Sequence, residues 1–387
     1  MTLKALVVFG TRPEAIKMAP LVSALKRKEQ VHTLVAVTAQ HREMLDQVLD
    51  LFGIVPDYDL NIMSHGQTLA DITGRVVSGM QEIIDKEKPD IVFVHGDTTT
   101  TFASALASFY CKTPVGHVEA GLRTRDKYSP FPEEMNRRLT AGLTDFHFAP
   151  TAAAKNNLLA EGINGGDIFV TGNTVIDALL SRVRGDYRFS SPILNRVLSG
   201  QKKIILVTAH RRENWGQPME NIFLALRDIA TAFKDIEIIF PVHKNPVLQD
   251  LAARILGDCQ GVNLVQPMDY EPFVNLMARS HIVLTDSGGL QEEAPALGKP
   301  VLVMRTVTER PEAVDAGTVR LVGADRKLIF EETARLLTDS EVYNEMAKAA
   351  NPYGDGHASE RITGWVLNRF NLSPGMPLEF SSSAGEN

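Results

Sequence analysis

The stretch from Ile282 to Glu312, IVLTDSGGLQEEAPALGKPVLVMRTVTERPE, predicts the architecture of the whole chain. Its β-branched run at 282–285 is typical of a strand, and the residues at 286–289 are typical of a tight turn. Helix-forming residues follow from Leu290, and a second strand is expected at 301–304. A strand, a glycine turn, a helix and a strand in this order predict a doubly wound α/β unit.

The turn in this stretch is a candidate binding site for an anion such as a diphosphate. Ser287 is followed by Gly288 and Gly289, which lack a Cβ and so leave room for a ligand. The helix behind the turn presents unpaired N–H groups to an anion. Glu292 and Glu293 lie one turn further, where a carboxylate can accept hydrogen bonds from ribose hydroxyls. The alternative is an ordinary Ser-Gly-Gly turn whose two glutamates only compensate the helix dipole.

Length and composition set the broad class of the protein. A chain of 387 residues is expected to form two domains, and 44% hydrophobic with 22% charged residues is ordinary for a globular protein. Two distant cysteines and an N-terminal apolar run that stops at Gly10 favour a cytoplasmic protein without a membrane span. A net charge of −7 argues against a nucleic-acid partner.

The first strand, at 3–9, ends in Gly10-Thr11-Arg12-Pro13 and leads into a helix. This turn matches neither a Walker A loop nor a Gly-x-Gly-x-x-Gly fingerprint, which argues against a P-loop NTPase and a nicotinamide enzyme. Arg12 and Lys17 are candidate phosphate contacts, and a merely solvated Lys17 is an equally good interpretation.

Two later strands each carry a histidine followed two positions on by a carboxylate, His95 with Asp97 and His117 with Glu119. The pattern favours acid/base chemistry by Asp97 and Glu119 at the strand ends. Binding of a divalent metal is the alternative, and both histidines fit a buried structural role as well.

The proline-rich loop at 128–134 predicts a further carboxylate, Glu133 or Glu134, at the start of a helix. In the second half, His210 follows a strand, and Phe273 is a candidate to stack on a base or to pack in a helix face. We expect two Rossmann-like domains, at 1–172 and 173–356, with a hinge near 172–185. A last helix at 357–371 is expected to complete the first domain, and 372–387 is expected to be a disordered tail.

Seven motifs, in order along the chain, resemble the non-hydrolysing UDP-N-acetylglucosamine 2-epimerases of bacteria, and the likeness runs from about Leu3 to Phe370. The motifs are FGTRPEA at 9–15, HGDT at 95–98, HVEAGLR at 117–123, PEEMNR at 132–137, HRRE at 210–213, TDSGGLQEE at 285–293 and TERPE at 308–312.

The resemblance implies two Rossmann-like domains that face each other across a cleft, as in GT-B glycosyltransferases. It implies interconversion of UDP-GlcNAc and UDP-ManNAc by a homodimer, with no metal or added cofactor. By similarity the catalytic residues are Asp97, Glu119, Glu133 and His210. The implied substrate contacts are Arg12, Lys17, Phe273 with uracil, Ser287, Gly288 and Gly289 with diphosphate, Glu293 with ribose, and Arg310.

One departure from the family pattern concerns activation by a second substrate molecule, which some members use. The stretch that reads Gln-His-Arg-Gln in those members ends here in Glu43, and Gly66 occupies a position where they have an arginine. The resemblance therefore gives no ground for expecting this activation. A glycosyltransferase, a hydrolysing epimerase and a sugar-nucleotide sensor remain the alternative functions.

Overall fold

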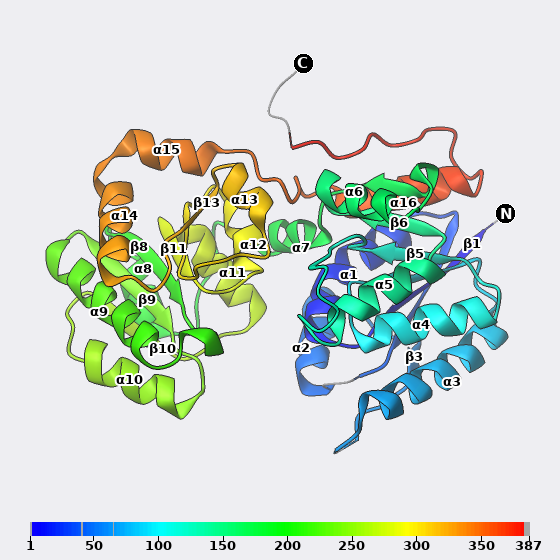
Figure 1. Ribbon diagram of the computed structural model, residues 1–387, viewed down its shortest axis with the longest axis horizontal. Coiled ribbons are helices and arrows are strands. Elements are labelled where there is room, and N and C mark those ends of the chain that lie inside the picture. The colour runs from blue at the N-terminus through cyan, green and yellow to red at the C-terminus, as the bar shows by residue number, and fades with distance from the viewer. Residues whose placement is uncertain (1, 40–41, 65, 383–387) are drawn as a thin grey trace. The chain divides into compact units, whose positions relative to one another are not determined.

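The computed structural model describes residues 2–39, 42–64 and 66–382, which form two compact units. The first unit comprises Met1–Leu180 with Tyr353–Ser381, and the second comprises Ser181–Pro352 (Figure 1). The division between the units lies inside the hinge region expected at 172–185 but later than the expected break after 172. The chain also returns to the first unit at Tyr353, before the expected position 357.

Helix α7 (Thr174–Arg182) explains why the first unit extends beyond residue 172. The buried carboxylate of Asp177 accepts hydrogen bonds from the backbone N–H groups of Ala358, at 3.2 Å, and Ser359, at 2.7 Å. These two groups lie at the start of α16 (Ala358–Arg369), so α7 is tied to the last helix of the same unit. No local sequence pattern reports this contact.

The first unit contains a seven-stranded parallel sheet in the order β3-β2-β1-β4-β5-β6-β7. Its central strands are almost wholly apolar because helices cover both faces of such a sheet. The strands are β1 (Leu3–Phe9), β2 (Val31–Val37), β3 (Tyr58–Asp59), β4 (Ile91–His95), β5 (Val115–Val118), β6 (Phe146–Ala149) and β7 (Ile168–Val170). The remaining helices are α1 (Arg12–Lys26), α2 (Arg42–Phe52), α3 (Leu69–Glu87), α4 (Thr99–Tyr110), α5 (Glu133–Leu143) and α6 (Ala152–Ala160).

The second unit repeats this plan with a six-stranded parallel sheet in the order β10-β9-β8-β11-β12-β13. Its strands are β8 (Lys203–Thr208), β9 (Ile236–Pro241), β10 (Val262–Val265), β11 (Ile282–Thr285), β12 (Val301–Val303) and β13 (Val319–Leu321). Its helices are α8 (Pro192–Leu198), α9 (Gln217–Ala232), α10 (Pro246–Leu256), α11 (Tyr270–Arg279), α12 (Leu290–Ala296), α13 (Pro311–Asp315), α14 (Arg326–Thr338) and α15 (Ser340–Lys348). The predicted Rossmann-like architecture of both halves is confirmed.

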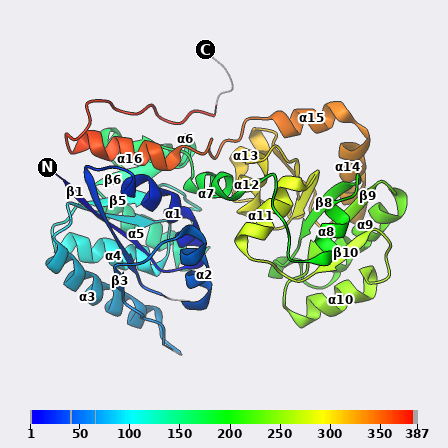
Figure 2. The same cartoon turned by 180° about the vertical axis from the view of Figure 1, so that it is seen from behind.

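The last helix, α16, belongs to the first unit, as the sequence predicts, and Figure 2 shows it among the elements of that unit. The ring of Trp365 packs edge-on against Phe146 and Phe148, with ring centroids 5.0 and 5.4 Å apart. Because Trp365 is only 3% exposed, this contact extends the core beneath β6 and β7.

The expected disordered tail differs from the structure between Leu372 and Ser381, which belong to the first unit. The side chain of Glu379 accepts a hydrogen bond from the Val170 backbone N–H at 3.0 Å, and the Phe380 N–H donates to the Val170 carbonyl at 2.9 Å. Strand β7 lies at the edge of its sheet, so its backbone groups need such partners. Residues 383–387 of the expected tail lie outside the described residues.

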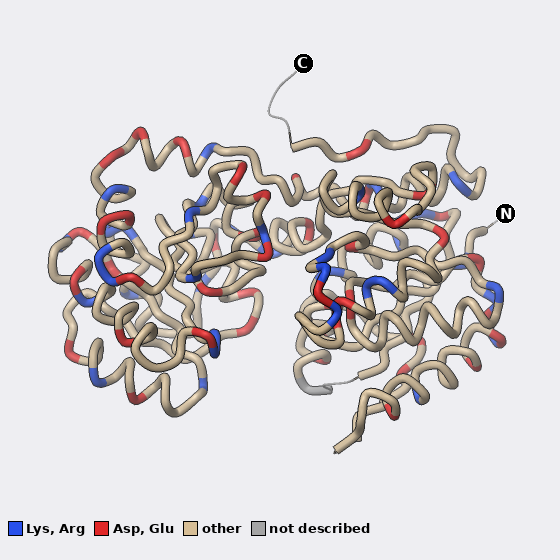
Figure 3. Tube along the Cα trace, viewed as in Figure 1, with Lys and Arg blue, Asp and Glu red and all other residues tan. Residues whose placement is uncertain are grey.

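Along the Cα trace, basic and acidic residues are interspersed in both units (Figure 3). Within the described ranges, no helix combines the length and the apolar character needed to cross a membrane.

Candidate functional site

Glu119, which directly follows β5, is the centre of a polar cluster in the first unit. Its Oε2 accepts a hydrogen bond from Asn173 Nδ2 at 2.7 Å and forms an ion pair with the ammonium group of Lys17. Glu119 adopts a left-handed backbone conformation with φ of +63°, and its side chain is only 8% exposed. The sequence offered Lys17 as a phosphate contact or as a solvated side chain; in the structure it pairs with the Glu119 carboxylate.

Asp97 lies beyond the neighbouring strand β4 and is held by Arg137 of α5. Arg137 donates to Asp97 Oδ2 from Nη2 at 2.7 Å and from Nε at 3.0 Å, and Asn136 Nδ2 donates to the Asp97 carbonyl at 2.9 Å. Asp97 follows β4 and Glu119 follows β5. Because these two strands are adjacent and parallel, both residues lie at the same edge of the sheet. Sequence reasoning missed the contact of Arg137, and its position inside the PEEMNR motif was the available signal.

The two glutamates at the start of α5 have different surroundings. Glu134 is fully buried, and its carboxylate accepts hydrogen bonds from the backbone N–H groups of Thr124, at 3.0 Å, and Arg125, at 3.2 Å. Glu133 has a buried Oε2 without a hydrogen-bond partner among the described residues. Glu134 therefore fixes the preceding loop, whereas no hydrogen bond among the described residues holds Glu133 Oε2.

The two histidines of the strand motif are buried beneath the carboxylates. His117 Nε2 hydrogen-bonds the Gly96 carbonyl at 2.7 Å, which agrees with the structural role weighed from the sequence. His95 Nε2 lies 3.9 Å from Glu119 Oε2, and no hydrogen-bond partner of its ring nitrogens occurs in the described part of the chain. Burial lowers the pKa of each histidine to about 4, so both rings are neutral at pH 7.

Arg12 is the first residue of α1, at the carboxyl end of β1, and is half-buried. The turn before it is held by Glu14, a buried carboxylate that sequence reasoning did not single out. Glu14 accepts hydrogen bonds from the N–H groups of Gly10, at 3.1 Å, and Thr11, at 2.8 Å, and from the Thr98 hydroxyl at 2.7 Å. Burial raises the pKa of Glu14 above its ordinary value. Glu14 thus fixes the backbone from which Arg12 extends.

In the second unit, His210 follows β8 and lies against Asp286, which follows β11. His210 Nδ1 is 3.3 Å from Asp286 Oδ1, and the His210 ring stacks on that of His243 with centroids 6.0 Å apart. Burial lowers the pKa of His210, and the Asp286 carboxylate opposes this effect. The sequence indicated His210; its buried partner Asp286 was noted only as part of a turn.

The turn that the sequence offered as an anion site lies between β11 and α12, and α12 has only seven residues. Neither Gly288 nor Gly289 has a positive φ, so the backbone does not require glycine there. A Cβ at Gly288 would lie 3.7 Å from an Arg211 guanidinium nitrogen, which is an ordinary contact. Ser287 is half-buried beside them, with its N–H donating to the Thr285 hydroxyl at 2.9 Å. Neither the backbone conformation nor the neighbouring protein atoms therefore require glycine at these two positions.

The helix behind this turn carries two buried carboxylates with different partners. Glu292 pairs with the guanidinium of Arg310, which sequence reasoning placed on the substrate. Glu293 Oε1 accepts a hydrogen bond from the Tyr270 hydroxyl at 3.3 Å. The first glutamate thus fixes Arg310, and the second is held by the first residue of α11.

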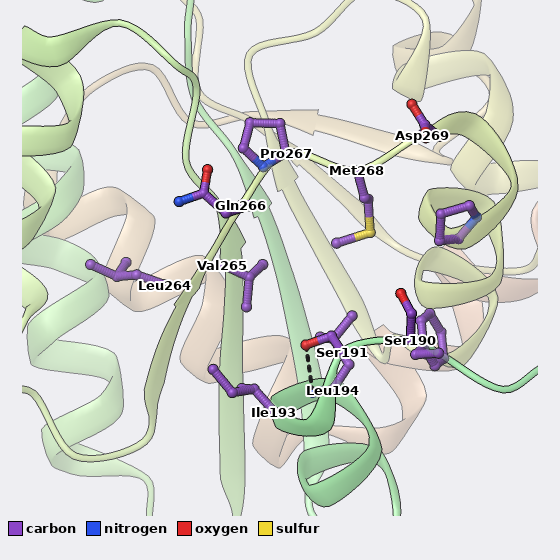
Figure 4. Close-up of a pocket in the computed structure, with 12 residues that line it drawn as sticks. Ser190, Ser191, Ile193, Leu194, Leu264, Val265, Gln266, Pro267, Met268 and Asp269 are labelled. Carbon is purple, nitrogen blue, oxygen red and sulfur yellow. Dashed lines mark hydrogen bonds between the residues drawn. The ribbon is translucent and has the colours of Figure 1, made fainter. Parts of the chain in front are cut away.

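Phe273 is half-buried on α11, close in sequence to a pocket of about 610 Å³ at the carboxyl end of β10 (Figure 4). The pocket wall includes Met268, Asp269 and Pro272, which lead into and begin α11, and Ser191 at the start of α8. None of the substrate-contact residues expected from the sequence lines this pocket.

The metal interpretation of the histidine and carboxylate pairs finds no matching geometry in the described ranges. No group of three or more histidine, cysteine, aspartate or glutamate side chains there could hold a metal ion. Gln40, His41 and His65, from the two stretches compared with the activated members, lie outside the described residues.

Solved structures share this architecture. The UDP-GlcNAc 2-epimerase of Neisseria meningitidis, solved bound to UDP-GlcNAc, superposes with a TM-score of 0.82 at 50% identity over 95% of this chain and 100% of that chain. A glycosyltransferase of kitacinnamycin, with a TM-score of 0.65 at 11% identity, covers 96% of this chain and 100% of that chain. The second likeness shows the GT-B-like fold alone.

The sequence comparisons agree. The family model described as UDP-N-acetylglucosamine 2-epimerase matches residues 23–367. The UDP-N-acetylglucosamine 2-epimerase of Bacillus subtilis is 55% identical over 379 residues, which are 98% of this chain and 99% of that protein. The chain therefore belongs to the UDP-N-acetylglucosamine 2-epimerase family.

Proposed function

We propose that this protein interconverts UDP-GlcNAc and UDP-ManNAc by inverting C2 of the sugar without net hydrolysis. The main support is the cluster of carboxylates in the first unit, where Asp97 and Glu119 follow adjacent parallel strands. Lys17 and Arg137 fix these two side chains. Proton transfer requires acids and bases held in defined positions, and this cluster provides them.

The chemistry explains why carboxylates and cations are both needed. No carbonyl acidifies the C2–H bond, so its direct deprotonation is too costly. Breaking the C1–O bond first releases UDP with the bonding electrons and leaves an oxocarbenium-like C1. A carboxylate then accepts the C2 proton, which gives 2-acetamidoglucal. A proton delivered to the other face of C2, with a UDP oxygen bonding to C1, completes the inversion.

Each unit has a task in this proposal. In the first unit, Asp97, Glu119 and Glu133 handle the C2 proton, while Arg12 and Lys17 stabilise negative charge on the departing diphosphate. In the second unit, His210 retains UDP. The nucleotide contacts of that unit are uracil on Phe273, diphosphate on Ser287, Gly288, Gly289 and Arg310, and ribose on Glu293.

The ion pair between Lys17 and Glu119 supports one refinement of this assignment. A diphosphate bound to Lys17 would compete with Glu119 for the same ammonium group. Binding of the nucleotide would therefore release the carboxylate for proton transfer.

The proposal also includes the location, the oligomeric state and the pathway of the protein. It would be a cytoplasmic homodimer that supplies a precursor for bacterial surface polysaccharides. Sedimentation analysis tests the dimer.

Incubation with UDP-GlcNAc alone in deuterated water tests the reaction. The proposal expects deuterium at C2 of the recovered sugar nucleotide, formation of UDP-ManNAc and unchanged rates with a chelator present. A requirement for an acceptor, without exchange at C2, would indicate a glycosyltransferase. Net release of ManNAc and UDP would indicate a hydrolysing epimerase, and nucleotide binding without turnover would indicate a sensor.

A further inference from the structure

We propose that Asp286 is a positioning residue for His210. Its buried carboxylate would keep the proton on Nδ1 of the ring and leave Nε2 as the nitrogen that meets the diphosphate. This inference rests on the proposed function for the task of His210. Asp286 itself would not touch the substrate.

The first support is the way Asp286 joins two strand ends. Asp286 is fully buried, and its own N–H donates to the Thr208 carbonyl at 3.2 Å, which links the ends of β11 and β8. Its Oδ2 accepts hydrogen bonds from the backbone N–H groups of His210 and Arg211, each at 2.8 Å, and from Asn214 Nδ2 at 3.3 Å. These bonds fix the His210 backbone relative to the carboxylate.

The second support is the other carboxylate oxygen. No hydrogen bond to Asp286 Oδ1 occurs among the described residues, yet this oxygen is buried and lies 3.3 Å from His210 Nδ1. A buried carboxylate oxygen is costly unless a donor or a positive charge compensates it. A small ring rotation that brings an Nδ1–H group onto Oδ1 would provide the donor.

The surroundings of His210 disfavour its protonation, and Asp286 opposes their effect. Arg211, on the same loop, and His243, which follows β9, both lower the pKa of His210, as burial does. Asp286 is the group that raises it. The His243 ring stacks with the His210 ring, with centroids 6.0 Å apart. Without the carboxylate, His210 would have no anionic partner among these neighbours and would be harder to protonate.

The tautomer then determines the chemistry. When Nδ1 keeps its proton, Nε2 is the atom that gains and loses a proton with pH. A protonated Nε2 donates to an oxygen of the departing diphosphate and adds positive charge where negative charge develops. In Asp286→Asn, the amide oxygen can still accept from the backbone N–H groups. Its NH₂ group would then face Nδ1, force the proton to Nε2 and add no negative charge.

Nitrogen NMR of the histidine rings tests the proposal without any need for turnover, with the His210 signals assigned by their loss in His210→Gln. We expect the neutral His210 ring of the native protein to carry its proton on Nδ1. Asp286→Asn should move that proton to Nε2 and lower the proton affinity of the ring by about tenfold or more. In calorimetry, the pH at which UDP affinity falls should shift down with it.

Asp177→Asn is the matched control, because Asp177 is also a buried carboxylate that accepts two backbone N–H bonds, and among the described residues it forms no ion pair with a histidine. It should lower stability while His210 keeps its tautomer and titration. An Nε2–H tautomer in the native protein would overturn the proposal even if Asp286→Asn does not fold. Unchanged His210 titration in Asp286→Asn would overturn it too. If the native protein exchanges C2 and the His210 tautomer is the same in Asp286→Asn, only the positioning role is refuted. If the native His210 ring carries its proton on Nδ1 but the native protein does not exchange C2, only the epimerase function is refuted.

Discussion

The surroundings of Glu119 separate its proposed chemical role from a structural one. Its Oε2 accepts from Asn173 and pairs with Lys17, two groups that reach it from the end of β7 and from α1. Glutamine at this position can still accept from Asn173, but it neither removes a proton nor pairs with an ammonium group. The substitution Glu119→Gln thus tests the charge of the side chain while most of its shape is retained.

We expect Glu119→Gln to reduce epimerase turnover by about a hundredfold or more, the usual scale for loss of an acid or base. UDP affinity should be retained or improved, because Lys17 loses its competing carboxylate. Steady-state rates and calorimetry measure the two effects. Glu161→Gln, which alters a carboxylate paired with Arg123, is the control and should leave turnover within about twofold. Turnover near that of the native protein in Glu119→Gln would rule out the proposed role.

Glu133 and Glu134 form a second contrast, because adjacent glutamates have opposite environments. Glu133→Gln should lower turnover by about a hundredfold with little change in the urea midpoint, since its buried Oε2 has no hydrogen-bond partner to lose among the described residues. Glu134→Gln should cost about 1–3 kcal/mol of stability, because its carboxylate accepts two backbone N–H bonds and contacts Arg137. The reverse pattern in the two variants would show that the assignments must be exchanged.

Much of the candidate site at residue scale was predictable because its members follow strand ends in recognisable motifs. Asp97, Glu119 and His210 each come directly after or near the end of a buried parallel strand. Partners from distant segments were not predictable. Lys17 and Glu119 are 102 positions apart, and only the folded sheet brings them together. The different fates of Glu133 and Glu134 likewise depend on the loop at 124–125, which no local pattern reports.

At the scale of elements, buried strands were the best predicted features. The bounds of β1 and β11 agree with the expected ranges 3–9 and 282–285, because each apolar run ends at turn-forming residues. Strands β3 and β13 were missed. They have two and three residues and lie at sheet edges, so their sequences show neither a long apolar run nor an alternation.

The turn after Glu119 gives a prediction about an element connection. Gly121 has φ of +91°, and an added Cβ would lie 2.3 Å from the Ala154 carbonyl oxygen at the start of α6. Gly162 has a similar φ of +87° but has nothing within 4 Å of an added Cβ. Gly121→Ala should therefore lower the free energy of unfolding by about 1–3 kcal/mol through backbone strain, and by a similar amount through the steric clash. Gly162→Ala should cost the strain alone.

Urea unfolding of the two glycine variants measures the difference. The pair is matched because both residues have left-handed backbones in the first unit and differ mainly in the space around the added methyl group. Equal losses of stability would mean that α6 moves away at little cost. In that case the close approach of this turn to α6 would not be needed for the fold.

For the whole molecule, the sequence predicted two α/β halves and a returning last helix, but not where the chain crosses between the units. The expected break after 172 missed the attachment of α7 through Asp177 to Ala358 and Ser359. The composition of the C-terminal segment suggested disorder, whereas Glu379 and Phe380 bind the edge strand β7. Both features depend on contacts between segments far apart in the chain, which composition and periodicity do not record.

The buried histidines of the first unit make its stability depend on pH. Burial lowers the pKa of His95 and His117 to about 4 and that of His147 to about 3, below the value of 6.5 for an unburied histidine. The unfolded chain therefore binds more protons below pH 6.5, and the free energy of unfolding falls as the pH decreases toward 4. As the pH falls from 7 to 5.5, each histidine should lower the free energy of unfolding by about 1 kcal/mol.

Trp365, which is 3% exposed in the first unit, reports this effect when the other tryptophan is removed by Trp215→Phe. The urea midpoint followed by Trp365 fluorescence should fall from pH 7 to pH 5.5, and His147→Gln in the same background should reduce that fall. Glu14 and Asp177 act in the opposite direction, because burial raises their pKa and the folded state then favours their protonation at low pH. A constant midpoint would mean that these carboxylates balance the three histidines, and a midpoint that rises toward pH 5.5 would mean that they outweigh them.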